Sequence, residues 1–260
     1  MAFLRLPTGL GALVLLGAAC AFPAAAQGSG RDTAPRFEVV LSDDFSRGYR
    51  TELWGAPFHG SPYWNNGFWW DRDDVQVRDG VLEVTTRRHP DGRWTAGGFN
   101  SYLAGHTITY GRVEFDARVE QAQGTTVSIL MWPKSNDWPK DGEINIIETP
   151  RGRNMMTSHW QTPGGRHTYD NQFSDAFDAR QWNRYRLTWL PDRLTVEVNG
   201  RRVAEWTRPE AIPRGPMGFG AMGFVGTANE SWMGGAPDAT TPSRVTMQID
   251  NVVMSQWRGE

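Results

Sequence analysis

Short segments in which apolar and polar residues alternate make up most of this chain. Between residues 111 and 119, Val113, Phe115 and Ala117 alternate with arginine, glutamate and aspartate. Because successive side chains on a strand point to opposite faces, this alternation predicts a strand with one buried face. Alternating, β-branched or aromatic runs predict further strands at residues 37–41, 75–77, 81–86, 127–131, 155–161, 184–190, 194–198, 203–206, 216–225 and 245–257.

Turn residues separate these segments. Asp79-Gly80 and Asn199-Gly200 are typical of two-residue type I′ hairpin turns. The chain holds 29 glycines and 16 prolines and has no long helical pattern, so we expect an all-β, antiparallel β-sandwich. Residues 54–73 and 226–242 are too irregular for strands, and we expect them to be polar, aromatic loops that carry binding residues.

One predicted strand, residues 143–148, carries two carboxylates. Strict alternation would put Glu143 and Glu148 on opposite faces. A β-bulge adds one residue and resets the alternation, so that Glu143, Asn145 and Glu148 share one face while the isoleucines face the core. The two carboxylates would then lie about 5–5.5 Å apart, which is the separation that retaining glycoside hydrolases use.

Two plainer interpretations of this segment are open from the spacing alone. The glutamates could be solvated surface groups, since charged side chains are seldom buried. An amphipathic helix would place Glu143 and Ile147, four residues apart, on one face. The β-branched isoleucines of the segment favour the strand.

The N-terminus has the pattern of an export signal. Arg5 precedes an apolar run, and three alanines at residues 24–26 form a small-residue cleavage site. We therefore predict a signal peptide at residues 1–26, a flexible leader at residues 27–36, and a secreted or periplasmic protein. The alternatives are a retained N-terminal anchor and a lipoprotein attached through Cys20, but the leucine usual three residues before a lipoprotein cysteine is missing.

Composition narrows the function further. Cys20 is the only cysteine, so a chain cut after residue 26 must rely on its core, which a single domain at residues 37–257 is long enough to build. The 27 basic residues against 29 acidic ones argue against a nucleic-acid partner, and no later segment resembles a membrane span. The 13 tryptophans suit stacking on sugar rings, although any one of them can equally lie in the core.

Five motifs follow one another between about residues 37 and 257. Ahead of and into the acidic strand they are Tyr110-Gly111-Arg112-Val113-Glu114, then Trp132-Pro133 and Trp138-Pro139-Lys140-Asp141-Gly142 leading to Glu143-Ile144-Asn145-Ile146-Ile147-Glu148. After it they are Trp189-Leu190-Pro191-Asp192-Arg193 with Val198-Asn199-Gly200, Trp232-Met233-Gly234-Gly235-Ala236-Pro237-Asp238, and Ile249-Asp250-Asn251-Val252. In this order they resemble glycoside hydrolase family 16, the family of laminarinases, lichenases, carrageenases and agarases.

The resemblance implies a concanavalin A-like jelly roll with a substrate groove across its concave sheet. It also implies that Glu143 is the nucleophile and Glu148 the general acid/base of a retaining mechanism. Two nearby carboxylates repel, which raises one pKa and lets the pair divide these roles. The family usually has aspartate where this chain has Asn145. The amide keeps the size, can donate an N–H to Glu143 and removes a negative charge, so we expect activity with an altered pH profile.

The resemblance further implies a set of substrate-binding residues. Trp138 would stack beside the cleaved sugar, His159 would line the groove, and Trp232 would stack at a distal subsite, although each could instead be structural. Arg112 and Glu114, on the polar face of their strand, would contact sugar hydroxyls or be solvated.

Asp250 matches a position that binds a structural calcium ion in several family members, together with a backbone carbonyl near Gly80. Asp250 could equally be a capped turn residue, and the sequence does not reveal how many oxygen ligands a calcium ion would find. We expect no cofactor to be required.

The sequence therefore predicts a secreted, monomeric, retaining endo-glycosidase that hydrolyses internal β-glycosidic bonds of a polysaccharide, with a β-glucan favoured. Two alternatives share the fold: a non-catalytic polysaccharide-binding protein, and a transglycosylase that passes the glycosyl group to another sugar. Loops set the sugar subsites, so the motifs leave the polysaccharide itself open.

Overall fold

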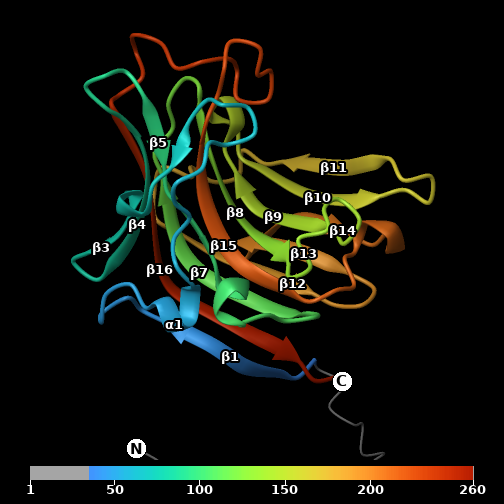
Figure 1. Cartoon of the computed structure of the whole chain (residues 1–260). Coiled ribbons are helices and arrows are strands. Elements are labelled where there is room, and N and C mark those ends of the chain that lie inside the picture. Colours follow the sequence, from blue (N-terminus) through green and yellow to red (C-terminus); the bar gives the residue numbers. More distant parts are fainter. Residues whose placement is uncertain (1–34, 260) are drawn as a thin grey trace, which may run out of the picture. The chain divides into compact units, whose positions relative to one another are not determined.

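The computed structural model describes residues 35–259. The predicted signal peptide, Cys20 and most of the predicted leader at residues 27–36 lie outside the described residues. Within the described range the regular structure is almost entirely strand, in two sheets, and most neighbouring strands are antiparallel (Figure 1). The prediction of an all-β, antiparallel sandwich is confirmed.

The larger sheet contains ten strands of the described part of the chain. They are β1 (Phe37–Asp43), β2 (Trp69–Trp70), β3 (Val75–Arg78), β4 (Val81–Arg88), β5 (Trp94–Ala96), β7 (Gly111–Val119), β12 (Asn183–Trp189), β13 (Leu194–Val198), β14 (Arg201–Trp206) and β16 (Arg244–Trp257). The order is β14-β13-β12-β7-β16-β4-β5-β2, with β1 beside β16 and β3 beside β4. Within residues 35–259, β2 and β5 form the one parallel pair.

The smaller sheet contains six strands of the described range. They are β6 (Gly98–Asn100), β8 (Thr125–Pro133), β9 (Glu143–Glu148), β10 (Met155–Gln161), β11 (His167–Phe173) and β15 (Met217–Val225). The order is β11-β10-β9-β8-β15-β6, so β9 lies inside the sheet, between β8 and β10. The acidic strand is therefore held on both sides by backbone hydrogen bonds.

Helical segments in the described chain are short. They are α1 (Thr51–Trp54) and four 3₁₀ turns, η1 (Arg72–Asp74), η2 (Ser101–Ala104), η3 (Pro150–Gly152) and η4 (Pro209–Ala211). Across residues 35–259, no helix has the length and apolar character that crossing a membrane would require.

The core lies between the two sheets. Phe115 on β7 stacks on Tyr185 of β12 with ring centroids 5.1 Å apart, and its ring lies 5.3 Å from that of Phe219 on β15, in the other sheet. All three side chains are fully buried. Alternate positions of strands such as β7 and β12 supply the rest of this core, which is why apolar alternation predicted them.

The two predicted hairpin turns are present. Asp79 and Gly80 have φ values of 51° and 78°, and Asn199 and Gly200 have the same two values. A type I′ turn requires positive φ at both central residues, which asparagine, aspartate and glycine tolerate best. These turns set the pairing of β3 with β4 and of β13 with β14.

Two strands of the smaller sheet, β6 and β11, have no counterpart in the sequence prediction. β11 reads His-Thr-Tyr-Asp-Asn-Gln-Phe and lies at the edge of the sheet, beside β10. Its side chains are half-buried or exposed, so it lacks the apolar alternation that marks the other strands. β11 matters because it brings His167 and Tyr169 next to β10.

The two long loops pack together through a second apolar cluster. Phe68, Phe224 and Met233 are buried in this cluster, and Tyr63 and Trp232 pack against it. The ring of Tyr63 stacks on that of Phe68 with centroids 4.8 Å apart. The cluster therefore joins the loop that precedes β3 to the loop that follows β15.

Candidate active site

β9 contains the predicted β-bulge. Its pairing with β8 joins Glu148 to Ser128 and Asn145 to Leu130, so β9 has one more residue than β8 between these two pairs. The pairing of β9 with β10 shifts at the same place. The extra residue resets the alternation of side chains along β9.

The bulge puts the acidic residues on one face. We call the side of the smaller sheet that is turned away from the core its open face. The three isoleucines of β9 are fully buried in the core, so Glu143, Asn145 and Glu148 lie on the open face, as predicted. Asn145 and Glu148 are only 1% and 4% exposed, respectively, so bulk water does not solvate them.

Each glutamate accepts a hydrogen bond from a different neighbour. Trp138, in the loop before β9, donates its indole Nε1–H to Oε2 of Glu143 at 2.7 Å. Thr157, on β10, donates its hydroxyl to Oε2 of Glu148 at 2.7 Å. The two carboxyl groups therefore have different environments, although they belong to the same strand.

Burial raises the pKa of both glutamates. The pKa of Glu143 rises to about 7, because burial outweighs the hydrogen bonds from Trp138 and Asn145 that favour its charged form. The pKa of Glu148 rises to about 8, first through burial and second through the negative charge of Glu143. Glu143 therefore ionises first, which leaves Glu148 protonated near neutral pH.

Asn145 belongs to a polar chain that crosses the open face. Its Oδ1 accepts the hydroxyl hydrogen of Ser128 at 2.7 Å, and its Nδ2 lies 3.1 Å from Nε2 of His159. The other ring nitrogen of His159, Nδ1, lies 3.0 Å from Nε2 of His167. The chain thus runs from β8 through β9 and β10 to β11 at the edge of the sheet.

Trp138, which bonds Glu143, belongs to a group of aromatic rings. The ring of Trp138 stacks on that of Trp132, with centroids 6.3 Å apart and planes at 11°, and lies 4.6 Å from the ring of His167. Trp138 is 40% exposed and Tyr169 is 55% exposed. Exposed rings beside a buried acid can stack on the apolar faces of a sugar.

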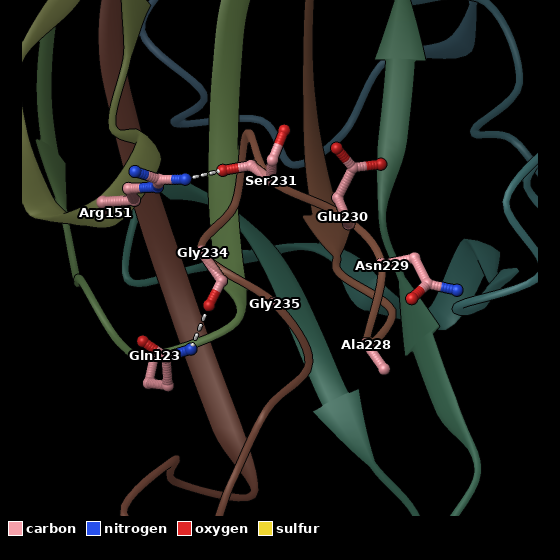
Figure 2. A pocket seen from close by; sticks show the side chains of 8 residues that line it. All are labelled: Gln123, Arg151, Ala228, Asn229, Glu230, Ser231, Gly234 and Gly235. Carbon is pink, nitrogen blue, oxygen red and sulfur yellow. Dashed lines mark hydrogen bonds between the residues drawn. The ribbon is translucent and has the colours of Figure 1, made fainter.

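A cavity of about 490 Å³ opens where β8 begins and β9 ends. Figure 2 shows that Arg151 of η3, Gln123 and the loop at residues 228–235 line it. Arg151 Nη2 donates to the backbone oxygen of Ser231, and Gln123 Nε2 donates to that of Gly234 at 2.8 Å. The lining is rich in polar groups that can bind hydroxyls.

Tyr63 connects the cavity loop electrostatically to the glutamates. Burial raises the pKa of Tyr63 to about 12, and the negative charges of Glu143, Glu230 and Glu148 add to the rise. Glu230 lines the cavity. The charges of the cavity loop and of the glutamates therefore raise the pKa of the same phenol.

Trp138, His159 and Trp232 have different positions relative to the glutamates. Trp138 and His159 lie beside Glu143 and Asn145, through the hydrogen bonds described above. Trp232 is half-buried and packs edge-on against Phe224, with ring centroids 5.5 Å apart, on the loop that lines the cavity. The contribution of all three to sugar binding stays a prediction.

Arg112 and Glu114 require a correction, because the structure does not bring them to the open face. They lie on β7 of the larger sheet, where the alternate residues fill the core, so both side chains point to the outer face of that sheet. The guanidinium of Arg112 lies 4.2 Å from the ring centroid of Phe37. Glu114 accepts a hydrogen bond from Arg186 at 2.9 Å. The alternating pattern correctly predicted a strand. Its polar face belongs to the larger sheet, whereas the glutamates lie on the open face of the smaller sheet.

Asp250 also lies on the larger sheet, on β16. Its Oδ1 accepts the backbone N–H of Asn251 at 2.7 Å. Burial raises the pKa of Asp250, and the charges of Asp116, Asp44 and Asp43 add to the rise. The part of the chain that the structure describes has no group of three or more histidine, cysteine, aspartate or glutamate side chains placed to hold a metal ion. Calcium at Asp250 therefore stays a prediction from the family resemblance.

Four residues of the site were not identified from the sequence. Ser128 and Thr157 lie on the open-face positions of two predicted strands, so alternation along these strands could have indicated them. His167 lies on the unpredicted strand β11, and Tyr63 lies in an irregular loop. No local pattern distinguishes either residue.

A two-sheet sandwich with a bulged strand that carries a half-buried and a buried glutamate on one face defines a class of carbohydrate-active proteins. The chain belongs to the family Glycosyl hydrolases family 16, whose model matches residues 64–256. This match covers both glutamates and most strands of both sheets.

Known proteins similar to this chain fit that assignment. A keratan-sulfate endo-1,4-β-galactosidase of Sphingobacterium multivorum is 26% identical over 238 residues, which cover 83% of this chain and 54% of that protein. A β-glucanase of Rhodothermus marinus is 34% identical over 129 residues, 45% of each chain. The chain spans about half the length, or less, of the curated relatives it matches.

Solved structures support the fold independently. The catalytic domain of an endo-1,3-β-glucanase (laminarinase) from Thermotoga petrophila superposes with a TM-score of 0.70 at 19% sequence identity. The superposition covers 87% of this chain and 100% of that domain. At this identity the likeness establishes the jelly-roll fold.

Proposed function

We propose that this protein is an exported, retaining endo-glycosidase that hydrolyses internal β-glycosidic bonds of a polysaccharide, with a β-glucan favoured as the polymer. The observation that carries the proposal is the pair Glu143 and Glu148. Both lie on one face of β9, both have raised pKa values, and each accepts a hydrogen bond from a different donor.

The environments of the two glutamates suit two chemical roles. Glu148, protonated near neutral pH, donates its proton to the glycosidic oxygen while the Glu143 carboxylate attacks the anomeric carbon. This step forms a glycosyl ester on Glu143 and leaves Glu148 ionised. Glu148 then takes a proton from a water molecule, which attacks the ester and releases the sugar with its original configuration.

The surroundings of the pair support sugar binding. Trp138 offers a partly exposed ring beside the carboxylate that would attack the sugar. The polar cavity, lined by Arg151 from the segment that follows β9, offers hydroxyl-binding groups. A polysaccharide that crosses the open face would then contact an aromatic surface on one side and a polar one on the other.

The polymer is assigned from the relatives. The Rhodothermus relative is named a β-glucanase and the Thermotoga structure a laminarinase, which favours a β-glucan. The Sphingobacterium relative is named for keratan sulfate, so a β-linked galactan is the competing substrate class. Export is proposed from the signal-peptide pattern at residues 1–26.

The experiment is a reducing-sugar assay of the protein on laminarin, mixed-linkage β-glucan, keratan sulfate and agarose, with Glu143→Gln as the matched variant. We expect release of oligosaccharides from a β-glucan, and a loss of at least about 10³-fold in the variant, because glutamine cannot form the glycosyl ester. Binding of the polymer by the variant, measured by affinity electrophoresis, should persist.

The same assay separates the alternatives. Polymer binding without any release of reducing ends by the parent protein would establish the non-catalytic binding protein instead. Products longer than the substrate, in the presence of acceptor oligosaccharides, would establish the transglycosylase. Hydrolysis by Glu143→Gln at the parent rate would remove Glu143 from the mechanism.

A further inference from the structure

Four side chains from four adjacent strands form one continuous hydrogen-bonded chain. It joins Ser128 to Asn145 at 2.7 Å, Asn145 to His159 at 3.1 Å, and His159 to His167 at 3.0 Å. Ser128 and Asn145 are buried. The rings of His159 and His167 are stacked, with centroids 5.2 Å apart and planes at 16°.

Such a chain has two self-consistent arrangements of hydrogen atoms. In the outward arrangement, Ser128 donates to Asn145 Oδ1, Asn145 Nδ2 donates to His159 Nε2, and His159 Nδ1–H donates to His167. In the inward arrangement, every donor becomes an acceptor and the amide of Asn145 turns over. A neutral imidazole has one donor and one acceptor nitrogen, so fixing one link fixes all the others.

The amide of Asn145 has the outward orientation in the structure. Its Oδ1 accepts from Ser128 at 2.7 Å, and its Nδ2 faces Nε2 of His159 at 3.1 Å. Asn145 shares the open face with the glutamates, and its amide favours the charged form of both. A charged carboxylate only accepts hydrogen bonds, so an amide that presents its NH₂ group stabilises the ionised Glu143 that the proposed mechanism requires.

We propose that His167 is a positioning residue that holds the amide of Asn145 toward the catalytic glutamates, and that protonation of His167 reverses the chain. A doubly protonated His167 can only donate to His159. His159 must then carry its hydrogen on Nε2 and donate it to Asn145, which turns the amide oxygen toward the carboxylates. Acid therefore removes a donor from the site through a residue that does not touch the glutamates.

The surroundings of the two histidines suit this role. Facing His167 are His159 from β10, Tyr169 from its own strand, and Trp138, whose indole is bound to Glu143 of β9. Burial lowers the pKa of His159 to about 3, and the neighbouring His167 adds to this. Burial also lowers the pKa of His167, so both rings are neutral at neutral pH.

The direction of the chain explains why an amide occupies position 145. An aspartate there could accept from His159 but could not donate to it. Asn145→Asp would therefore force the inward arrangement, in which His167 donates to His159. In the parent protein, protonation of His167 opposes the outward arrangement of the hydrogen bonds. In this variant it would favour the inward arrangement that is already present, and so stabilise it.

The test is ¹⁵N NMR of the histidine side chains, in the full parent protein and in Asn145→Asp, across pH. There are only five histidines, so each ring can be assigned. We expect His159 to be the Nδ1–H tautomer in the parent and the Nε2–H tautomer in Asn145→Asp. The pKa of His167 should rise by about one unit or more in the variant. His89 and His106, which bond Thr95 and a backbone oxygen elsewhere, are the internal controls and should not change.

The inference is overturned if His159 is the Nε2–H tautomer in the parent at neutral pH, or if neither its tautomer nor the His167 pKa differs in Asn145→Asp. It deepens the proposed function and rests on it for its catalytic meaning. The tautomer readout needs no turnover, so its failure is distinguishable from a failure to hydrolyse polysaccharide.

A kinetic comparison tests the positioning role separately. His167→Phe keeps a ring against Trp138 but removes the acceptor for His159, so kcat should fall about tenfold, the effect of one lost hydrogen bond, with little change in KM. His167→Gln supplies an acceptor oxygen and should recover most of kcat. Equal kcat values and equal pH profiles in the parent and His167→Phe would contradict the proposal.

Discussion

Trp138 and Thr157 each donate one hydrogen bond, but to different glutamates. The indole of Trp138 bonds Glu143, and the hydroxyl of Thr157 bonds Glu148. Both bonds favour the charged form of the acceptor, and burial works against both. In the proposed mechanism Glu143 must be ionised and Glu148 protonated, so activity should rise around pH 7 and fall around pH 8.

This division predicts that two substitutions move opposite limbs of the pH profile. Trp138→Phe removes the donor to Glu143, raises its pKa, and should shift the acid limb of kcat/KM upward by about one pH unit. Thr157→Val removes the donor to Glu148 at nearly constant volume and should shift the alkaline limb upward by a similar amount. Initial rates on a soluble β-glucan between pH 5 and pH 10 measure both limbs. The same limb moving in both variants would show that the roles are not divided in this way.

At the level of the element, the bulge in β9 decides which residues meet substrate. Without the extra residue between Asn145 and Glu148, strict alternation along Glu-Ile-Asn-Ile-Ile-Glu would turn Glu148 into the core. The neighbouring strands of the smaller sheet hold this register, because β8 and β10 pair with β9 on its two sides.

A single and a double deletion at the bulge should have opposite outcomes. Deletion of Ile146 leaves regular alternation that keeps Glu143, Asn145 and Glu148 on one face, so measurable activity should remain. Deletion of both Ile146 and Ile147 puts Glu148 directly after Asn145, which turns its side chain to the opposite face and should cost about 10²–10⁴-fold, the usual contribution of a general acid. Rates on a β-glucan, with circular dichroism as the folding control, measure both. Full activity in the double-deletion variant would contradict the role of the bulge.

Alternating patterns in the sequence predicted the strands that bury one face in the core. They did not predict elements that bury little, or residues whose position depends on distant segments of the chain. β7 and β12 alternate apolar and polar residues because one face of each packs in the core. β11 buries little, so its sequence carries no such pattern, although it supplies His167. The glutamate pair was predictable because six consecutive residues of one strand define it. Ser128 reaches Asn145, and Thr157 reaches Glu148, only through the pairing of neighbouring strands.

At the level of the whole molecule, the site is built at a cost to stability. Two carboxyl groups with raised pKa values bind protons more tightly in the folded chain than in the unfolded one. Stability from such groups is fully present below their unfolded pKa, near 4.5, and is lost as pH rises through about 7 and 8. Ionisation of Glu143 and Glu148 in the folded chain therefore lowers the free energy of unfolding in alkaline solution.

The double variant Glu143→Gln/Glu148→Gln should remove this loss. It should be more stable than the parent at pH 9 by at least about 1 kcal/mol, and the advantage should shrink or vanish at pH 4. Urea unfolding at the two pH values measures the difference, and the titration of all other groups cancels in the comparison. A constant difference at both pH values would show that the pKa values of the pair are not raised by folding.

The claim on which the proposed mechanism depends is that Glu143 forms a covalent bond to the sugar. An activated 2-deoxy-2-fluoro β-glucoside or its oligosaccharide slows breakdown of that ester, and peptide mass spectrometry of the inactivated protein locates the label. We predict a single sugar adduct on Glu143, in the peptide that also contains Asn145 and Glu148, and none in Glu143→Gln. A label on Glu148 or elsewhere, with Glu143 unmodified in an inactivated protein, would contradict it.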